Sequence, residues 1–433
     1  FITVSLFLAF LNRLSLGLYV LASVSFFYGW EIVLSRYAWS KNIAYLASIN
    51  APLMDYIATI LFISLVVSLL FKKTKINWSS LRYLLIPTTF YFLFLLFALV
   101  SAWSAYDGHV ILSIKFWLRN MVFVYIAYVL LVNIFINKEK VLQTVMQVWY
   151  YVGLLVAIFG LSSLLIVSQD GWNRVVPYGI GSFAPLGHNH NLIAEVLIAI
   201  IPIAFYFTIK NFASKRRNWY IAGLLIMVAA ELLTLSRAGW LSLTMQLIIA
   251  LYFFRSDVKD FLIKKSKVLF VPLLVAIVFV STYMVLFLTT SVVTSSNIAR
   301  LRSTDVVLFY AQSQPFLGYG PGMYIPILAN TKDFTMDFGL PLDAHGFGQK
   351  ILLEEGVVGL VLFCLTLLYI LWFVWKSQQK THGHEQFVLQ ILFLTAFGAI
   401  IFQLFNTSYF NSVMWMPLGV ALSAAGLARN KLL

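Results

Sequence analysis

The sequence predicts an all-α polytopic membrane protein with about twelve transmembrane helices. Of its 433 residues, 61% are hydrophobic and only 11% are charged, whereas a soluble protein carries about a quarter charged residues. Uncharged apolar runs recur from one end of the chain to the other. The loops between these runs alternate in charge, because 20 of the 30 lysines and arginines fall in every second loop. By the positive-inside rule those loops are cytoplasmic, and both termini are expected on that side.

The apolar runs, taken in order, predict where the spans lie. Most of them approach the ~20 residues that a helix needs to cross a bilayer. We place the spans at residues 15–34, 51–71, 83–103, 116–136, 145–168, 192–209, 219–235, 239–254, 268–290, 356–375, 387–405 and 412–428. The first eleven residues of the chain are expected to form a partial span or an interfacial helix.

The loop lengths divide the chain into four segments. N-terminal helices occupy 1–167, central helices 168–290 and C-terminal helices 356–433. The segment between them, 291–355, is long for a connection, which is typical of functional loops. It is rich in proline and glycine but keeps helical pieces such as 305–314. We therefore predict an ordered extracytoplasmic domain of short helices there.

Charge and cysteine content exclude several classes of function. The net charge is +14, but the basic residues are spread over all inner loops, so nucleic-acid binding is a poor explanation for them. The single cysteine, Cys364, excludes a disulfide within the chain and is expected to pack in a helix. No CxxC or HxxxH spacing is present, so we predict no metal site and no cofactor.

Arg237 is the most informative of the ten basic residues on the outer side. It lies in "LTLSRAGWLSL", residues 233–243, where two spans meet in a tight joint at the membrane boundary. The planar fork of a guanidinium suits bidentate contact with a phosphate of a lipid-linked substrate. The alternative is an arginine that anchors a helix end to lipid headgroups.

A second basic pair precedes a glycine-rich turn in "ARLRSTDVVLFYAQSQPFLGYGPGMY", residues 299–324. Either Arg300 or Arg302 is a candidate phosphate ligand, and an ion pair with Asp305 is the alternative for each. The "GYGPG" stretch lacks the Lys-Ser/Thr ending of a nucleotide-binding loop, so its predicted role is to shape a turn.

His345 lies in "LDAHGFGQKILLEEG", just ahead of a predicted span. Imidazole titrates near neutral pH and can accept a proton from a sugar hydroxyl. Asp343, Glu354 and Glu355 are candidates to orient the ring. The alternative is an exposed loop histidine without a catalytic role.

The stretch "PLGHNHNLIAE", residues 185–195, opens a span with polar groups. Asn189 or Asn191 is expected to be the N-cap, and the donors there, with the helix dipole, form a candidate anion site. His188 and His190 lack a third metal ligand nearby, so capping and hydrogen bonding are favoured over metal binding.

Carboxylates inside spans need partners. Glu195 and Glu231 are such groups, and Arg237 and Arg119 are candidate partners for them. Outer-loop aromatic side chains are candidates for stacking on sugar rings: Trp172, Tyr178, Tyr319 and Tyr324.

The order of these motifs resembles the O-antigen ligase/O-antigen polymerase superfamily of bacterial envelope glycosyltransferases. The resemblance covers about residues 180–375 and rests on "GHNHNLIAE", "TLSRAGW", Arg300 through "PFLGYGPG", and "HGFGQKILLEEGVVG". The chain departs from the family pattern where Gly346 replaces asparagine, Thr304 replaces tryptophan and Ala238 replaces glycine.

The resemblance implies a GT-C-like architecture and transfer of a glycan from undecaprenyl pyrophosphate on the outer, periplasmic face of the inner membrane, without a metal or a nucleotide sugar. By position, Arg237 and Arg300 would hold the pyrophosphate, and His345 would activate the acceptor hydroxyl with inversion. Glu354 or Glu355 would orient His345 or close the loop onto the span. Further residues expected to contact substrate are Arg302, His188, Asn189, Asn191 and Arg119.

The acceptor is lipid A core oligosaccharide for a ligase and another lipid-linked repeat for an O-antigen, exopolysaccharide or teichuronic-acid polymerase. A flippase or transporter for lipid-linked oligosaccharides is the alternative from another class. A transporter should spread ionisable groups through the membrane midplane. Here the marked residues gather at the outer boundary and in one long outer loop, which favours chemistry on that side.

Overall fold

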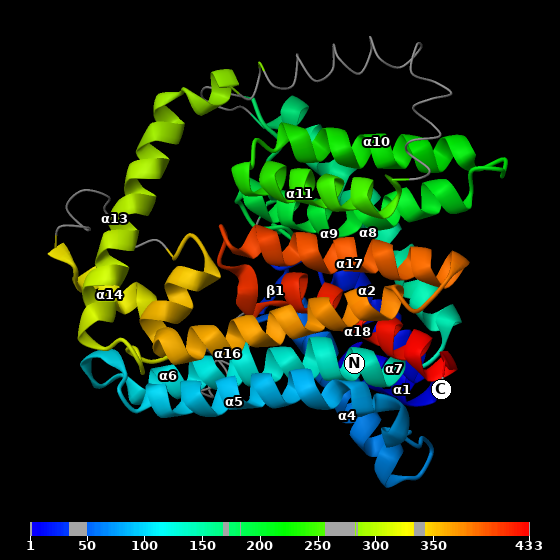
Figure 1. Cartoon of the computed structure of the whole chain (residues 1–433), viewed down its shortest axis with the longest axis horizontal. Coiled ribbons are helices and arrows are strands. Elements are labelled where there is room, and N and C mark those ends of the chain that lie inside the picture. The colour runs from blue at the N-terminus through cyan, green and yellow to red at the C-terminus, as the bar shows by residue number, and fades with distance from the viewer. Residues whose placement is uncertain are drawn as a thin grey trace. The chain divides into compact units, whose positions relative to one another are not determined.

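The structure is a computed structural model that describes residues 2–33, 50–167, 173–181, 183–255, 282, 285–332 and 343–432. Most of the predicted span 268–290 lies outside these residues, and so does Trp172. The chain forms two compact units (Figure 1). Unit 1 contains Phe1–Leu95, Leu118–Thr244 and Leu362–Leu433, and unit 2 contains Leu96–Trp117 and Met245–Val361.

Unit 1 is a bundle of apolar helices. In chain order these are α1 (Ile2–Asn12), α2 (Leu14–Val24), α4 (Leu53–Leu70), the 3-10 turn η3 (Trp78–Leu84) with the start of α5 (Leu85–Ala102), the π-helical turns η5 (Leu118–Phe123) and η6 (Ile126–Leu130), α7 (Leu131–Phe135), α8 (Glu139–Ile166), α9 (His190–Lys210), α10 (Arg217–Leu233), the start of α11 (Arg237–Phe253), the end of α16 (Phe347–Gln378), α17 (Gly383–Gln403), the 3-10 turn η7 (Ser408–Phe410) and α18 (Ser412–Leu432). Two short strands, β1 (Glu31–Val33) and β2 (Asn50–Pro52), pair antiparallel with Ile32 opposite Ala51. Helix α9 is largely enclosed, because α8, α10 and α17 all pack against it.

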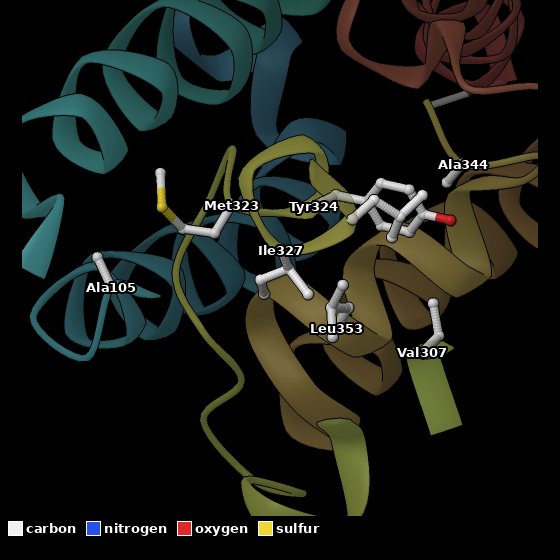
Figure 2. Close-up of a cluster of buried hydrophobic side chains, with 8 residues drawn as sticks. Ala105, Val307, Met323, Tyr324, Ile327, Ala344 and Leu353 are labelled. Carbon is white, nitrogen blue, oxygen red and sulfur yellow. The ribbon is translucent and has the colours of Figure 1, made fainter. Parts of the chain in front are cut away.

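Unit 2 gathers elements that are far apart in sequence. These are the end of α5, the 3-10 turn η4 (Tyr106–Gly108), α6 (Val110–Trp117), the end of α11, α13 (Ser291–Ser313), α14 (Tyr324–Asn330) and the first part of α16 (Phe347–Gln378). Their shared core, seen in Figure 2, consists of Ala105, Val307, Met323, Tyr324, Ile327, Leu328, Ala344 and Leu353. The predicted helical piece 305–314 is therefore the end of a much longer helix, α13.

Seven helices in the described residues are long and apolar enough to cross a membrane: Leu53–Leu70, Trp78–Ala102, Val110–Phe135, Glu139–Ile166, His190–Lys210, Phe347–Gln378 and Gly383–Gln403. The predicted all-helical, multi-pass class is confirmed. Twelve spans stay a prediction, since α10, α11 and α18 satisfy only part of these criteria.

The first predicted span, 15–34, is wrong. Helix α2 ends at Val24, and the chain turns into β1. Helices α1 and α2 are separated at Arg13, whose backbone is extended, and each has 11 residues. A helix rises 1.5 Å per residue, so neither alone covers the ~30 Å apolar core of a bilayer.

The turn after α2 contains a close backbone approach at Gly29. A Cβ built on Gly29 would lie 2.3 Å from the Ala184 carbonyl oxygen. Only glycine permits this contact, and a straight helix through residue 34 would not make it.

Candidate functional site

Helix α16 is broken at Gly356, and the "PFLGYGPG" stretch binds the break. Gly356 has φ 68° and ψ −171° inside the helix. The Leu353 carbonyl accepts from the Tyr319 N–H at 3.0 Å, and the Glu354 carbonyl accepts from the Gly320 N–H at 2.8 Å. A helix break within a membrane span frees backbone groups that must find partners inside the protein. Two motifs separated in sequence thus form one backbone-bonded unit.

Glycine is required on both sides of this contact. Gly318 has φ 69°, and a Cβ there would lie 2.5 Å from the Glu354 carbonyl oxygen. A Cβ on Gly356 would lie 2.3 Å from the Phe316 carbonyl oxygen. The left-handed backbone and the short approach exclude other side chains. This confirms that "GYGPG" shapes a turn.

Two serines at the end of α5 donate hydrogen bonds to carbonyls of the broken helix and of the glycine-rich turn. The Ser101 hydroxyl lies 2.5 Å from the Leu317 carbonyl oxygen and 2.7 Å from that of Glu354. The Ser104 hydroxyl lies 3.2 Å from the Gly318 carbonyl oxygen. The sequence analysis missed both serines, because two serines at the end of an apolar run carry no distinctive signal.

Glu354 supports the same turn. Its side chain is fully buried, and Oε1 accepts from the Tyr324 N–H at 3.0 Å. The Glu354 side chain therefore binds the backbone at the first residue of α14. Tyr324 is itself fully buried in the core of unit 2, so the expected stacking of its ring on a sugar is wrong. The Glu355 carboxylate is also fully buried and has no hydrogen-bond partner in the described part of the chain.

A short bridge connects His345 to the turn of α13 that carries Arg300. The Gln349 Oε1 accepts from the His345 N–H at 3.3 Å, and the Gln349 Nε2 donates to the Thr304 Oγ1 at 2.6 Å. Thr304 Oγ1 in turn donates to the Arg300 carbonyl at 2.8 Å. His345 and Arg300 are both half-buried. Thr304, a departure from the family pattern, thus has a defined hydrogen-bonding role, and Gln349 was not foreseen.

An ion pair closes the loop around His345. The Lys350 Nζ lies 2.7 Å and 2.9 Å from the two Asp343 carboxylate oxygens. Lys350 is only 3% exposed, and its Nζ lies 5.4 Å from the centre of the Phe116 ring. Asp343, one of the candidates to orient His345, therefore binds Lys350 in this structure, and its role toward the imidazole stays a prediction. Losing one partner of a buried ion pair is strongly destabilising, so the pair fixes the path of the loop.

In unit 1, the start of α9 and the start of α11 are joined by a hydrogen bond. Asn189 is the N-cap of α9, with its Oδ1 accepting from the Asn191 N–H at 3.0 Å. The Asn191 Oδ1 accepts from the Ser236 hydroxyl at 2.8 Å. Ser236 immediately precedes Arg237, the first residue of α11. The "GHNHN" and "SRAGW" motifs therefore form one local structure, with Asn189 rather than Asn191 as the cap.

The joint before Arg237 is strained. Leu235 has φ 56°, a left-handed conformation that is rare for a bulky residue. Thr234 stabilises the turn, because its hydroxyl donates to the Glu231 carbonyl at 2.7 Å and accepts from the Ser236 N–H at 3.2 Å. Such strain persists where the surroundings enforce it and often marks functional sites.

Residues 222–364 match the family model described as O-Antigen ligase. The predicted resemblance to the O-antigen ligase/polymerase superfamily is thereby confirmed. No curated protein matches the chain. The O-Antigen ligase match includes Arg237, Arg300 and His345 but begins after the "GHNHN" motif.

The remaining residues expected in an O-antigen ligase site are placed as follows. Arg302 is exposed on α13, and His188 is exposed ahead of α9. No group of three side chains suited to hold a metal ion occurs among the described residues. Arg119 pairs with Asp55, with Nη2 3.8 Å from Oδ2.

The two carboxylates inside α9 and α10 differ in environment. Glu195 accepts hydrogen bonds from the side-chain amides of Gln403 and, at 3.3 Å, Asn406. Glu231 is fully buried, and neither of its oxygens has a hydrogen-bond partner in the described part of the chain. It faces Gly239 at the start of α11. Tyr178 stacks on Phe159 with ring centres 4.2 Å apart, and Tyr319 packs against Tyr310.

Proposed function

We propose that this protein is a metal-independent inverting glycosyltransferase of the O-antigen ligase type, with about twelve transmembrane helices in a GT-C-like arrangement. It transfers a glycan from undecaprenyl pyrophosphate to a hydroxyl of lipid A core oligosaccharide, on the outer face of the inner membrane. The observation that carries the proposal is the Thr304–Gln349 bridge, which holds the His345 loop against the Arg300 turn within the stretch that matches the O-Antigen ligase model.

The proposed reaction is a single displacement. His345 accepts the proton of the acceptor hydroxyl, and the oxygen attacks the anomeric carbon of the donor glycan. The bond from that carbon to the pyrophosphate breaks, and undecaprenyl pyrophosphate leaves with the electron pair. A positioned base typically contributes about 10²–10⁴-fold in rate. Attack opposite to the leaving group inverts the anomeric centre.

The arginines bind the charge that develops on the pyrophosphate. A guanidinium presents a rigid fork of donors that matches phosphate oxygens, and fixed donors aimed at developing charge are often the largest catalytic contribution. Arg300 and Arg237 are proposed for this role, with the more exposed Arg302 in reserve for Arg300. His188, Asn189 and Asn191 are proposed to extend the anion-binding surface near Arg237, since a helix N-terminus attracts negative charge.

A broken helix inside a candidate span is also expected of a transporter. In this chain the carbonyls of Leu353 and Glu354, which the break frees, already accept from Tyr319, Gly320 and Ser101. Both carbonyls therefore already have partners inside the protein. This argues for a scaffold that positions the loop rather than for a substrate gate.

The experiment is transfer by purified protein in nanodiscs, with a defined lipid-linked donor and two acceptors. Glycan transfer to lipid A core oligosaccharide supports the ligase. Transfer to a second lipid-linked repeat instead identifies a polymerase of the same superfamily. Movement of the donor across liposome membranes with no transfer to either acceptor refutes the enzyme and supports the flippase.

A further inference from the structure

A polar cavity of about 130 Å³ lies within unit 1, away from the α9–α11 joint in sequence. It is formed where the turn after α2, the first turn of α4, η5 and the turn before α18 meet. Its polar lining comes from Tyr28, Asp55, Arg119, Asn120 and Asn411. A polar cavity among apolar helices is costly unless water or a ligand satisfies its groups.

The charges in this cavity are balanced. Asp55 Oδ2 lies 3.8 Å from the Arg119 Nη2, and Asp55 Oδ1 accepts from the Tyr128 hydroxyl at 2.5 Å. Tyr128 is fully buried, so the carboxylate is held in place. A phosphate bound by Arg119 would also lie close to the Asp55 carboxylate, and the two negative groups would repel each other. The cavity therefore favours a neutral polar ligand over an anion.

Asn120 supplies an amide to the cavity and lies in a π-helical turn. Its side chain is half-buried and forms no hydrogen bond within the described part of the chain. A π-turn inserts an extra residue and changes the directions of the side chains around it, and such turns are frequent at functional sites. An amide offers both donors and an acceptor, as does each hydroxyl of a sugar.

We infer that this cavity binds one neutral sugar ring of a glycan substrate, with Asn120 and Asp55 as its principal hydrogen-bond partners. Sites for drug-sized molecules usually measure ~300–1,000 Å³, so the smaller cavity suits a single ring. The lysines that follow α4, at positions 72, 73 and 75, place the first turn of α4 on the predicted outer side. The inference rests on the proposed function for its choice of a glycan, and the ring belongs to either the donor or the acceptor.

The test begins with binding, which does not require turnover. Saturation-transfer NMR with methyl glycosides of glucose, galactose, mannose and N-acetylglucosamine is measured on wild type, Asn120→Leu and Asp55→Asn. Asn137→Leu is the matched control, since Asn137 is exposed and does not line the cavity. We expect transfer to at least one glycoside in wild type and control, and a loss of roughly tenfold in affinity in Asn120→Leu. No transfer to any glycoside in wild type, or equal affinity in Asn120→Leu, overturns the inference.

The kinetic arm identifies the source of the ring. With the lipid-linked donor and glycan acceptor, Asn120→Leu should raise KM for one substrate by about tenfold and leave kcat nearly unchanged. The substrate whose KM rises is the one that places its sugar here, and two unchanged KM values count against the inference. If wild type binds a glycoside but transfers no glycan to any acceptor, the proposed function fails while the sugar site stands.

Discussion

Replacing Gln349 by leucine should slow the reaction without removing any group that touches substrate. Gln349 bridges the His345 N–H and the Thr304 hydroxyl with contacts of 3.3 Å and 2.6 Å. Leucine has a similar size and leaves the half-buried site filled. The loop that carries His345 would then lose its connection to α13, while the Asp343–Lys350 pair would still hold its ends.

The magnitude follows from the two hydrogen bonds. A neutral hydrogen bond contributes about 0.5–1.5 kcal/mol, so the bridge contributes about 1–3 kcal/mol. Each 1.36 kcal/mol corresponds to tenfold in rate, and a displacement of about 1 Å can cost ~10²-fold. We expect kcat to fall by about 10–100-fold, with KM for the donor changed little. In Thr304→Val the hydrogen bond between Gln349 and His345 remains, so kcat should fall less than in Gln349→Leu.

The assay is steady-state transfer with purified variants, and Gln379→Leu, at the exposed position that follows α16, is the control. A double-mutant cycle decides whether Gln349 acts through His345. In the His345→Ala background, Gln349→Leu should have almost no further effect on kcat. Wild-type kcat in Gln349→Leu, or the same loss in both backgrounds, would refute the positioning role.

Three further predictions concern topology and chemistry. Cysteines placed at Lys215 and Lys332 should label from opposite sides of the membrane, and labelling of both from one side contradicts the orientation. Arg237→Lys and Arg300→Lys should each lose most activity and bind donor more weakly, because lysine keeps the charge but not the fork; near-normal rates in both would leave these arginines as lipid anchors. His345→Ala should lower the rate by about 10²–10⁴-fold with expression and donor binding intact. Because a protonated imidazole cannot accept a proton, the wild-type rate should fall as the pH drops through the range where imidazole titrates. EDTA should have no effect. Inhibition by EDTA with rescue by a divalent ion would contradict the mechanism.

Hydropathy and charge, read along the chain, determined the class of protein and the order of its motifs. A span is recognised from about 20 consecutive residues, so most helices were predicted to within a few residues of their ends. The exceptions are the 15–34 segment, where the helix ends at Val24 and the chain turns at Gly29, and the 356–375 span, whose helix already begins at Phe347. Glycine-rich turn chemistry likewise predicted the role of "GYGPG", because a positive φ is a property of the residue itself.

The partners of the polar groups were decided only by the tertiary structure. The Ser101 hydroxyl donates a hydrogen bond to the Glu354 carbonyl, 253 positions away in the sequence. The Ser236 hydroxyl donates to the Asn191 side chain, 45 positions away. The sequence placed Asp343 near His345, yet the carboxylate binds Lys350, seven residues further along. Hydropathy is an average over neighbours in the chain, whereas a hydrogen bond forms between whichever donor and acceptor the packed helices bring within about 3 Å. That is why the motifs could be found in the sequence, while the bridge from Arg300 through Thr304 and Gln349 to His345 appeared only once α13 and the start of α16 were packed together.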